Sequence, residues 1–315
     1  MQKLYEYLGI PFGFVISIFY ALTGNYLLSI FFLTLIVRIC LLPTAIKQQK
    51  SQAMQQRLQP KLRRIREKYG NDQRKIQEET QELYQREGFS AMGGGCLPML
   101  IQFPIMIGLY QVNYHPFSMV LRIPATVVTA LKDAVLPLLT ETEAKSTFRI
   151  ELFALQHWNE LDLSSIPGLT AEYIQKIELF IQRFTFFGLD LATAPDFKKF
   201  SIYWIVPIVS GLVALLTSIY SLVRQKKTNP EMAKNPSMGC MMLMMPAMQV
   251  YFAFLFPISV GIYIIMSSAI SFVQMIVLNH IYSPKKVLAK TMIDETVYRR
   301  SKEENTKKIN EFKQD

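Results

Sequence analysis

The sequence predicts an all-α polytopic membrane protein with five transmembrane helices, an N-terminal interfacial helix and a cytoplasmic helical hairpin. Composition is the first reason, because half of the 315 residues are hydrophobic and only 18% are charged, against about 25% in soluble domains. The second reason is that the charges are segregated along the chain. Four stretches contain no Asp, Glu, Lys or Arg: 7–37, 88–121, 200–223 and 235–284.

These uncharged stretches set the predicted spans, because a helix needs about 20 apolar residues to cross the hydrocarbon of a bilayer. The first predicted transmembrane helix covers 26–46, the second 93–113 and the third 200–222. The stretch 240–282 is long enough to hold the fourth and the fifth. We place the turn between them at Pro257, because proline interrupts a helix.

The net charge of the connecting segments predicts the orientation, because loops rich in Lys and Arg stay in the cytoplasm. Three segments are positive, with +5 over 47–90, +3 over the loop 223–239 and +3 over the tail 283–315, whereas 114–199 has a net charge of −2. The sequence therefore predicts an N-terminus outside, a basic cytoplasmic tail 283–315 and an extracellular helical segment 114–199.

The first 25 residues leave three interpretations open. Residues 7–22 are apolar but short for a span, and Pro11 and Gly13 interrupt them. An interfacial helix over 1–25, a short extra span, and the core of a signal peptide behind Lys3 all fit this pattern. The length favours the interfacial helix.

The segment 47–92 is predicted to be a charged helical hairpin. Its apolar residues recur at helical spacing, Gly70 ends the first helix, and Asp72 is a candidate N-cap of the second. The hairpin is either a solvated connector or a docking surface for anionic lipid, ribosomal RNA or a targeting receptor. The docking interpretation names four cations of the first helix: Arg57, Lys61, Arg63 and Arg64.

The outside segment 114–199 is too long for a tight connection. Helices are predicted over 125–139 and 171–187, the second capped by Thr170. The stretches 152–158 and 186–191 are predicted to lie on the outer membrane face, and the sequence assigns the segment no catalytic role.

Arg38 is the most informative single residue, because a cation inside a span costs at least about 2.5–3.5 kcal/mol on insertion scales. It faces a water-filled cavity, or it snorkels to the membrane edge or pairs with a carbonyl. No predicted span contains Asp or Glu, so the first interpretation makes Arg38 a site for an anionic group on a guest. Further polar residues that can line such a cavity, although each is also explained by helix packing, include Thr34, Gln102, Gln249, Ser267 and Ser271.

Several classes of chemistry are not supported. The three Cys and three His are scattered, which gives neither a disulfide set nor a metal site. No G-x-x-x-x-G-K-[ST] motif is present, so no nucleotide is expected. Spans without carboxylates also argue against a proton-coupled transporter. We predict no catalytic residue, no metal and no cofactor, and therefore no enzyme.

Several motifs together resemble those of the YidC/Oxa/Alb membrane-protein insertases. The most specific are Thr34-Leu35-Ile36-Val37-Arg38 and the block Gly95-Cys96-Leu97-Pro98-Met99-Leu100-Ile101-Gln102-Phe103-Pro104. Gln59-Pro60, Gly188-Leu189-Asp190-Leu191, Met244-Met245-Pro246 and Gly261-Ile262-Tyr263 fit as well. The resemblance covers about 26–113 and 186–283.

The resemblance implies five spans around a hydrophilic groove that is open to the cytoplasm and to lipid. Arg38 would there attract the polar or acidic stretch of a nascent membrane protein, which is then inserted and helped to fold. The implied location is the plasma membrane of a bacterium, of Gram-positive type because the outside segment is far shorter than a Gram-negative periplasmic domain. Candidate partners are the ribosome, the Sec translocon, a targeting receptor and anionic lipids.

Two other functions remain as alternatives. A solute transporter or channel predicts inverted repeats with discontinuous helices near the midplane, and the sequence shows none convincingly. A scaffold that organises membrane complexes is the third hypothesis.

Overall fold

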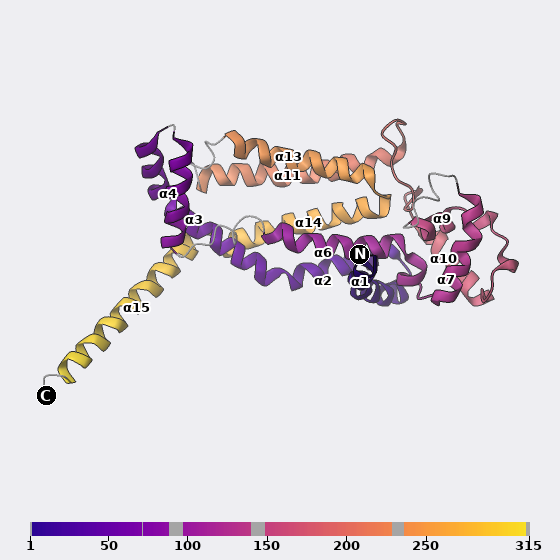
Figure 1. Cartoon of the computed structure of the whole chain (residues 1–315), viewed down its shortest axis with the longest axis horizontal. Coiled ribbons are helices and arrows are strands. Elements are labelled where there is room, and N and C mark those ends of the chain that lie inside the picture. Colours follow the sequence, from indigo (N-terminus) through magenta and orange to yellow (C-terminus); the bar gives the residue numbers. More distant parts are fainter. Residues whose placement is uncertain (1, 71, 88–96, 140–148, 229–235, 313–315) are drawn as a thin grey trace. The chain divides into compact units, whose positions relative to one another are not determined.

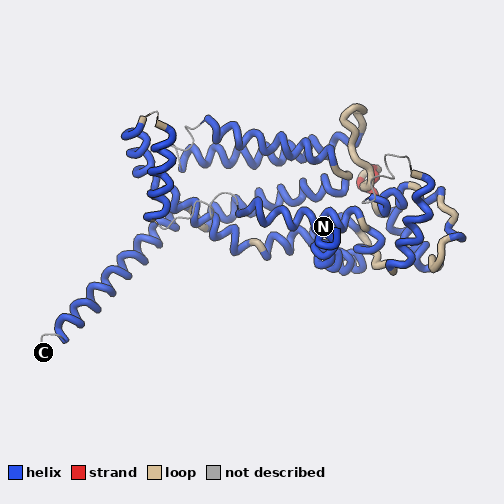
Figure 2. The backbone as a smooth tube through the Cα atoms, viewed as in Figure 1, coloured by secondary structure: helices blue, strands red, loops and turns tan. Residues whose placement is uncertain are grey.

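The computed structural model describes residues 2–70, 72–87, 97–139, 149–228 and 236–312, and over these ranges the chain is nearly all helical, as predicted (Figure 2). The chain divides into two compact units. The first consists of Met1–Cys40, Pro98–Tyr220 and Cys240–Ser271, and the second of Leu41–Leu97, Ser221–Gly239 and Phe272–Asp315. The α-helices are labelled in Figure 1.

The first unit begins with two packed helices, α1 (Gln2–Thr23) and α2 (Tyr26–Cys40). Phe19 of α1 stacks on Phe32 of α2, with ring centroids 4.9 Å apart. The turn between them is possible because Gly24 adopts a positive φ of 61°. Asn25 then starts α2, its side-chain oxygen accepting hydrogen bonds from the backbone of Leu27 and Leu28.

The long apolar helices are α6 (Leu97–Tyr114), α11 (Ile205–Thr228), α13 (Pro236–Leu255) and α14 (Ile258–Ile281). Within the described residues, two helices are long and apolar enough to cross a membrane, Ile202–Lys227 and Ile258–Ile281. A third is added if α2 and the start of the next helix form one broken span. The predicted number of five is therefore not reached by this criterion and stays a prediction.

The predicted outside segment folds into short helices. They are η1 (Pro116–Val120), a π-helix, then α7 (Ala125–Val135), η2 (Leu136–Leu138), α9 (Ile150–Gln156), η4 (Trp158–Glu160), η5 (Leu163–Ser165) and α10 (Ala171–Arg183). Thr170 caps α10 as predicted, accepting from the backbone of Tyr173. A two-stranded hairpin, β1 (Thr185–Phe186) and β2 (Leu189–Asp190), and the turn η6 (Ile202–Trp204) lead into α11.

The second unit contains α3 (Leu42–Tyr69), α4 (Gln73–Arg86) and α15 (Pro284–Phe312), with both α4 and α15 packed on α3. Helix α3 runs through Pro60, and it buries Leu58 and Leu62. Gly70 ends α3, and Asp72 caps α4 by accepting from the backbone of Lys75. These two ends agree with the sequence pattern.

A helix break at Leu41 lies inside the segment 26–46, for which one span was predicted. Helix α2 ends at Cys40, and Leu42 and Pro43 open α3. Proline has no N–H to continue the α2 hydrogen-bond ladder, whereas the first turn of a new helix tolerates it. The physical consequence is that Arg38 lies in the last turn of α2 rather than deep inside a longer helix.

Candidate functional site

The candidate site centres on Arg38, whose side chain reaches across from α2 to α14. Its Nη2 donates to the hydroxyl of Ser267 at 2.6 Å and to the backbone carbonyl of the same residue at 3.3 Å. The guanidinium is half-buried. Its position at the carboxyl end of α2 is favourable, because the helix dipole is negative there.

Arg38 retains donors that the protein does not use. A guanidinium has five N–H groups, and both hydrogen bonds of Arg38 come from Nη2. Across the ranges that the structure describes, Nε and Nη1 make no hydrogen bond and Arg38 forms no ion pair. The site therefore has a positive charge that is positioned by neutral groups and remains able to bind an anion.

Two serines of α14 shape the Arg38 contact. Ser267 is buried, and Ser271 lies one turn further along the same helix. The hydroxyl of Ser271 donates to the Ser267 carbonyl at 2.6 Å, so that carbonyl accepts from both Ser271 and Arg38. Three of the predicted residues, Arg38, Ser267 and Ser271, are thus brought together.

Gln249 lies on α13 and binds a different face of α14. Its Nε2 lies 3.2 Å from the hydroxyl of Ser268, and 3.1 Å and 3.3 Å from the hydroxyl and carbonyl oxygens of Ser210 on α11. Neighbouring positions of a helix point about 100° apart. Ser267 therefore contacts α2, and Ser268 contacts α13. Gln249 therefore joins three helices, which is the packing role of amides in membrane bundles.

Close approach of α11 to α14 depends on Gly261. A Cβ atom at this position would lie 2.5 Å from Cγ1 of Val206 on α11, closer than two carbons can pack. The absence of a side chain thus lets α11 contact the start of α14, on the same helix that carries Ser267 and Ser271.

The remaining predicted groove residues are placed differently. Thr34 is buried on α2, one turn before Arg38, and its hydroxyl donates to the carbonyl of Ile30 in its own helix at 2.7 Å. The Gln102 side chain lies outside the described residues, although its backbone belongs to α6.

The four cations proposed for docking lie on α3, in the second unit. Arg57 forms a two-point contact with Glu295 of α15, at 2.5 Å and 3.0 Å. Lys61 pairs with Glu87, and Arg63 pairs with Glu67 on its own helix at 2.8 Å. The side chain of Arg64 is exposed. Three of the four are therefore already paired with carboxylates of the same unit. The pairs of Lys61 and Arg63 are weak enough to exchange partners, whereas the two-point contact of Arg57 is half-buried.

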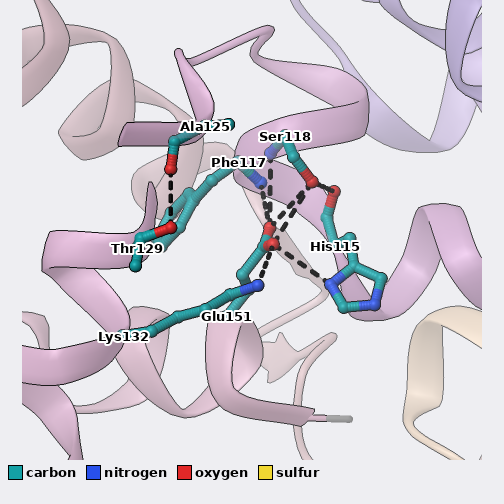
Figure 3. Close-up of polar contacts among 7 residues, drawn as sticks. All are labelled: His115, Phe117, Ser118, Ala125, Thr129, Lys132 and Glu151. Carbon is teal, nitrogen blue, oxygen red and sulfur yellow. Dashed lines mark hydrogen bonds and ion pairs between the residues drawn. The ribbon is translucent and has the colours of Figure 1, made fainter. Parts of the chain in front are cut away.

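Sequence reasoning missed a buried carboxylate, Glu151, in the segment 114–199 (Figure 3). Only 1% of its surface is exposed. Its oxygens lie 3.1 Å from Nδ1 of His115 and 3.2 Å from Nζ of Lys132, and they accept from the backbone of Phe117 at 3.0 Å and of Ser118 at 3.3 Å. Glu151 thus ties α9 to η1 and α7. An apolar neighbourhood, Ile150 and Leu152–Leu155, was the available signal, because a lone Glu inside it needs partners.

Over the residues that the structure describes, no group of three or more His, Cys, Asp or Glu side chains is placed to hold a metal ion. Cys40 is an exposed free thiol.

Comparison with protein families gives a match over most of the chain. Residues 18–286 match the family described as "60Kd inner membrane protein".

Individual relatives have a consistent description. A "Membrane protein insertase YidC 2" of Listeria innocua is 27% identical over 286 residues, covering 89% of this chain and 74% of the relative. A "Membrane protein insertase YidC" of Clostridium perfringens is 44% identical over 101 residues, 32% of this chain and 42% of the relative. One of Oleidesulfovibrio alaskensis is 35% identical over 136 residues, 41% of this chain but only 25% of the relative. Several relatives are thus matched over less than half of their length.

Proposed function

The chain belongs to the 60Kd inner membrane protein family, a family of membrane proteins, and from that premise we propose that it inserts newly made proteins into the membrane and helps them to fold. The relatives named above support the proposal, because each is described as a membrane protein insertase. The family is not one of catalytic enzymes, which agrees with a role that consists of binding and transfer.

Arg38 is the observation that carries the mechanism. Its charge is held on α14 by Ser267 and has no carboxylate partner within the described chain. Moving a polar or acidic tail across a bilayer is unfavourable mainly because its charges and backbone lose water. A fixed cation in a hydrated groove, open to the cytoplasm and to lipid, lowers that cost, and partitioning of the apolar segment supplies the driving force.

The groove also needs neutral polar walls. Ser267 and Ser271 supply such groups on α14, whereas Gln249, also predicted for the groove, contacts another face of α14 through Ser268. We propose that Thr34 and Gln102 line the same groove on α2 and α6. Because none of these groups is charged, they stabilise a passing polar segment without binding it tightly enough to hold it.

The proposed topology has five spans, an outside N-terminus and a cytoplasmic tail. Support for an interfacial α1 comes from its neighbours. Phe14 and Ser17 of α1 contact Arg122, which lies beyond η1, and Tyr20 packs edge-on against Phe180 of α10. Helix α1 also packs against α2 and α6, but these contacts tie its C-terminal half to the proposed outside segment, as we expect of a helix near the outer surface.

The basic cytoplasmic segments are proposed to meet the delivery partners. Arg57, Lys61, Arg63 and Arg64 on α3 offer cations to the acidic surfaces of a ribosome, a targeting receptor or anionic lipid, and the Sec translocon is a further candidate partner. The ion pairs of Lys61 and Arg63 would exchange their partners for such surfaces.

The test is Arg38→Ala in purified protein reconstituted into vesicles. Insertion of a substrate with an acidic translocated tail is expected to fall about tenfold or more, because a hydrogen bond to a charged group contributes about 1.5–3 kcal/mol. The measurement is the protease-protected fraction of the tail over time.

Arg38→Lys is the matched control, because it keeps the charge and is expected to retain more of the activity. A substrate with an uncharged tail should be affected much less. Equal insertion of the acidic-tailed substrate by Arg38→Ala and the unchanged protein contradicts the role of Arg38. Solute flux in the same vesicles would instead favour a transporter.

A further inference from the structure

The hairpin β1–β2 exposes aromatic side chains, and its turn has a backbone conformation that is unfavourable for one of them. Phe187 and Gly188 form its turn, both with positive φ, 49° and 79°. Such a turn normally uses Asn-Gly or Asp-Gly, because a left-handed conformation costs an ordinary residue about 1–2 kcal/mol. Phe187 is nevertheless 88% exposed, and its ring packs only edge-on against Phe186, with centroids 4.6 Å apart.

Backbone hydrogen bonds connect the chain that follows this hairpin to the start of α14. The backbone of Ser259 donates to the carbonyl of Leu191 at 3.0 Å, and that of Ile258 donates to the carbonyl of Thr193 at 2.9 Å. Ile258 and Ser259 open α14, which is long and apolar enough to cross a membrane. The chain just after β2 is therefore fastened to the end of a span.

The turn lies within reach of the membrane boundary. Leu191 is the fourth residue after Phe187, which corresponds to at most about 13 Å of extended chain. The headgroup region adds roughly 5–8 Å to each side of the hydrocarbon. A ring at Phe187 is therefore close enough to the start of α14 to reach a headgroup layer that surrounds this end of the helix.

A second group of exposed aromatic and apolar residues starts the other long span. Phe200 is 84% exposed and packs beside Trp204, with centroids 5.3 Å apart, and Ile202 is 68% exposed. Trp204 is oriented by its indole N–H, which donates to the carbonyl of Asp196 at 2.9 Å. Lys198 and Lys199 precede them in the sequence. Aromatic rings with flanking lysines at the end of a span are typical of the membrane interface.

We propose that these residues, the aromatic rim (Phe186, Phe187, Phe200 and Ile202), insert into the interfacial layer of the leaflet at which α11 and α14 begin. The partner is the lipid bilayer itself, because Phe200 and Ile202 continue the exposed apolar surface of α11, which includes Ile205, Ile208 and Leu212. Transfer of Phe187 into this layer offsets the backbone cost of its turn. The anchored hairpin then holds the segment 114–199 at the membrane surface, a role that does not depend on insertion activity.

The test places an environment-sensitive fluorophore at the rim. Cys40, Cys96 and Cys240 are changed to Ser, and Phe187→Cys is labelled and reconstituted into phosphatidylcholine/phosphatidylglycerol vesicles. The expected result is a blue-shifted emission. Lipids that carry a nitroxide near the headgroup should quench most of this emission, and aqueous iodide should quench little of it. Gln175→Cys, at an exposed polar position of α10, is the matched control and should show the reverse.

A second variant guards against misfolding of the labelled protein. Phe187→Trp, with Trp158 and Trp204 changed to Phe, keeps an aromatic ring in the turn and should show the same quenching by nitroxide lipid. Quenching of position 187 by iodide to the extent seen at position 175 places the rim in water and overturns the proposal. Protection from both quenchers indicates a protein partner, such as a second copy of the chain, and also overturns it.

Discussion

At the scale of single residues, the charges of Glu151 and Arg38 have opposite surroundings. Glu151 is buried and surrounded by His115, Lys132 and two backbone N–H groups, so its charge is fully used within the fold. Arg38 is half-buried and held by neutral serine oxygens. The first arrangement ties α9 to η1 and α7, and the second leaves guanidinium N–H groups that can bind an anion.

The Glu151 cluster makes the stability of the segment 114–199 depend on pH. Burial acts to raise the pKa of Glu151, but the hydrogen bond and charge of His115, the charge of Lys132 and the backbone N–H of Ser118 outweigh it and hold the pKa below its usual range. A carboxyl whose pKa is lowered by folding stabilises the fold above its unfolded pKa, and this stabilisation is lost as the pH falls through the folded pKa.

We therefore predict that Glu151→Gln destabilises this segment at neutral pH and weakens its acid sensitivity. Removing one charge of a buried pair costs about 3–5 kcal/mol when the partner is left unpaired. The glutamine keeps an oxygen that can accept hydrogen bonds, so we expect a cost near the lower end of this range. The measurement is thermal unfolding followed by Trp158, with Trp204 changed to Phe, between pH 7 and pH 3.

Glu160→Gln is the matched control, because Glu160 is exposed and its carboxylate bonds to nearby His157. It should leave the unfolding temperature nearly unchanged. If Glu151→Gln and the unchanged protein lose stability in parallel as the pH falls below about 4.5, the usual pKa of glutamate, the assigned role of Glu151 is wrong.

At the scale of elements, the contact between α1 and α6 depends on a missing side chain. A Cβ atom at Gly108 would lie 2.8 Å from the carbonyl oxygen of Leu8 and would also collide with the ring of Phe12. Backbone cannot move aside as a flexible side chain can. Helices in membranes gain much of their association energy from such close approaches at small residues, so Gly108 sets how closely α1 packs.

We predict that Gly108→Ala weakens the α1–α6 contact, with a cost of about 1–3 kcal/mol, as is usual for overpacking. The measurement is the protein's unfolding temperature in detergent, together with the rate at which protease removes α1. Gly108→Ala should cost less stability in a Phe12→Ala background than in the unchanged protein, because the ring that collides is gone. Strict additivity of the two changes would show that Phe12 does not meet position 108.

How far the sequence predicts each element follows from the kind of signal it gives. Thr170, Gly70 and Asp72 act locally, and the structure confirms all three as helix ends. The break at Leu41 was missed because hydropathy is continuous across it, although Pro43 was visible. Arg38 was identified by its charge alone, but its partner could not be, because Ser267 is 229 positions away and several serines were equivalent in sequence. Glu151 was missed for the same reason, since its partners come from η1 and α7.

At the scale of the whole molecule, the distribution of charge predicts the orientation in the membrane. The segments 47–90, 223–239 and 283–315 carry net charges of +5, +3 and +3, against −2 for 114–199. Cytoplasmic loops retain Lys and Arg, so all three basic segments are predicted to lie on one side. The same rule does not fix the N-terminus, because an extra span that begins inside and an interfacial helix give the same orientation downstream.

Single-cysteine variants separate these possibilities. In a background with Cys40, Cys96 and Cys240 changed to Ser, a membrane-impermeant maleimide added to intact cells is expected to label Gln175→Cys. It should label Glu303→Cys, in the tail, only after permeabilisation, which serves as the matched inside control. Lys3→Cys decides the position of α1. Labelling from outside agrees with an interfacial helix, as the contacts of α1 with Arg122 and Phe180 suggest. Labelling only after permeabilisation would make α1 a sixth span, and outside labelling of Glu303→Cys would reverse the topology.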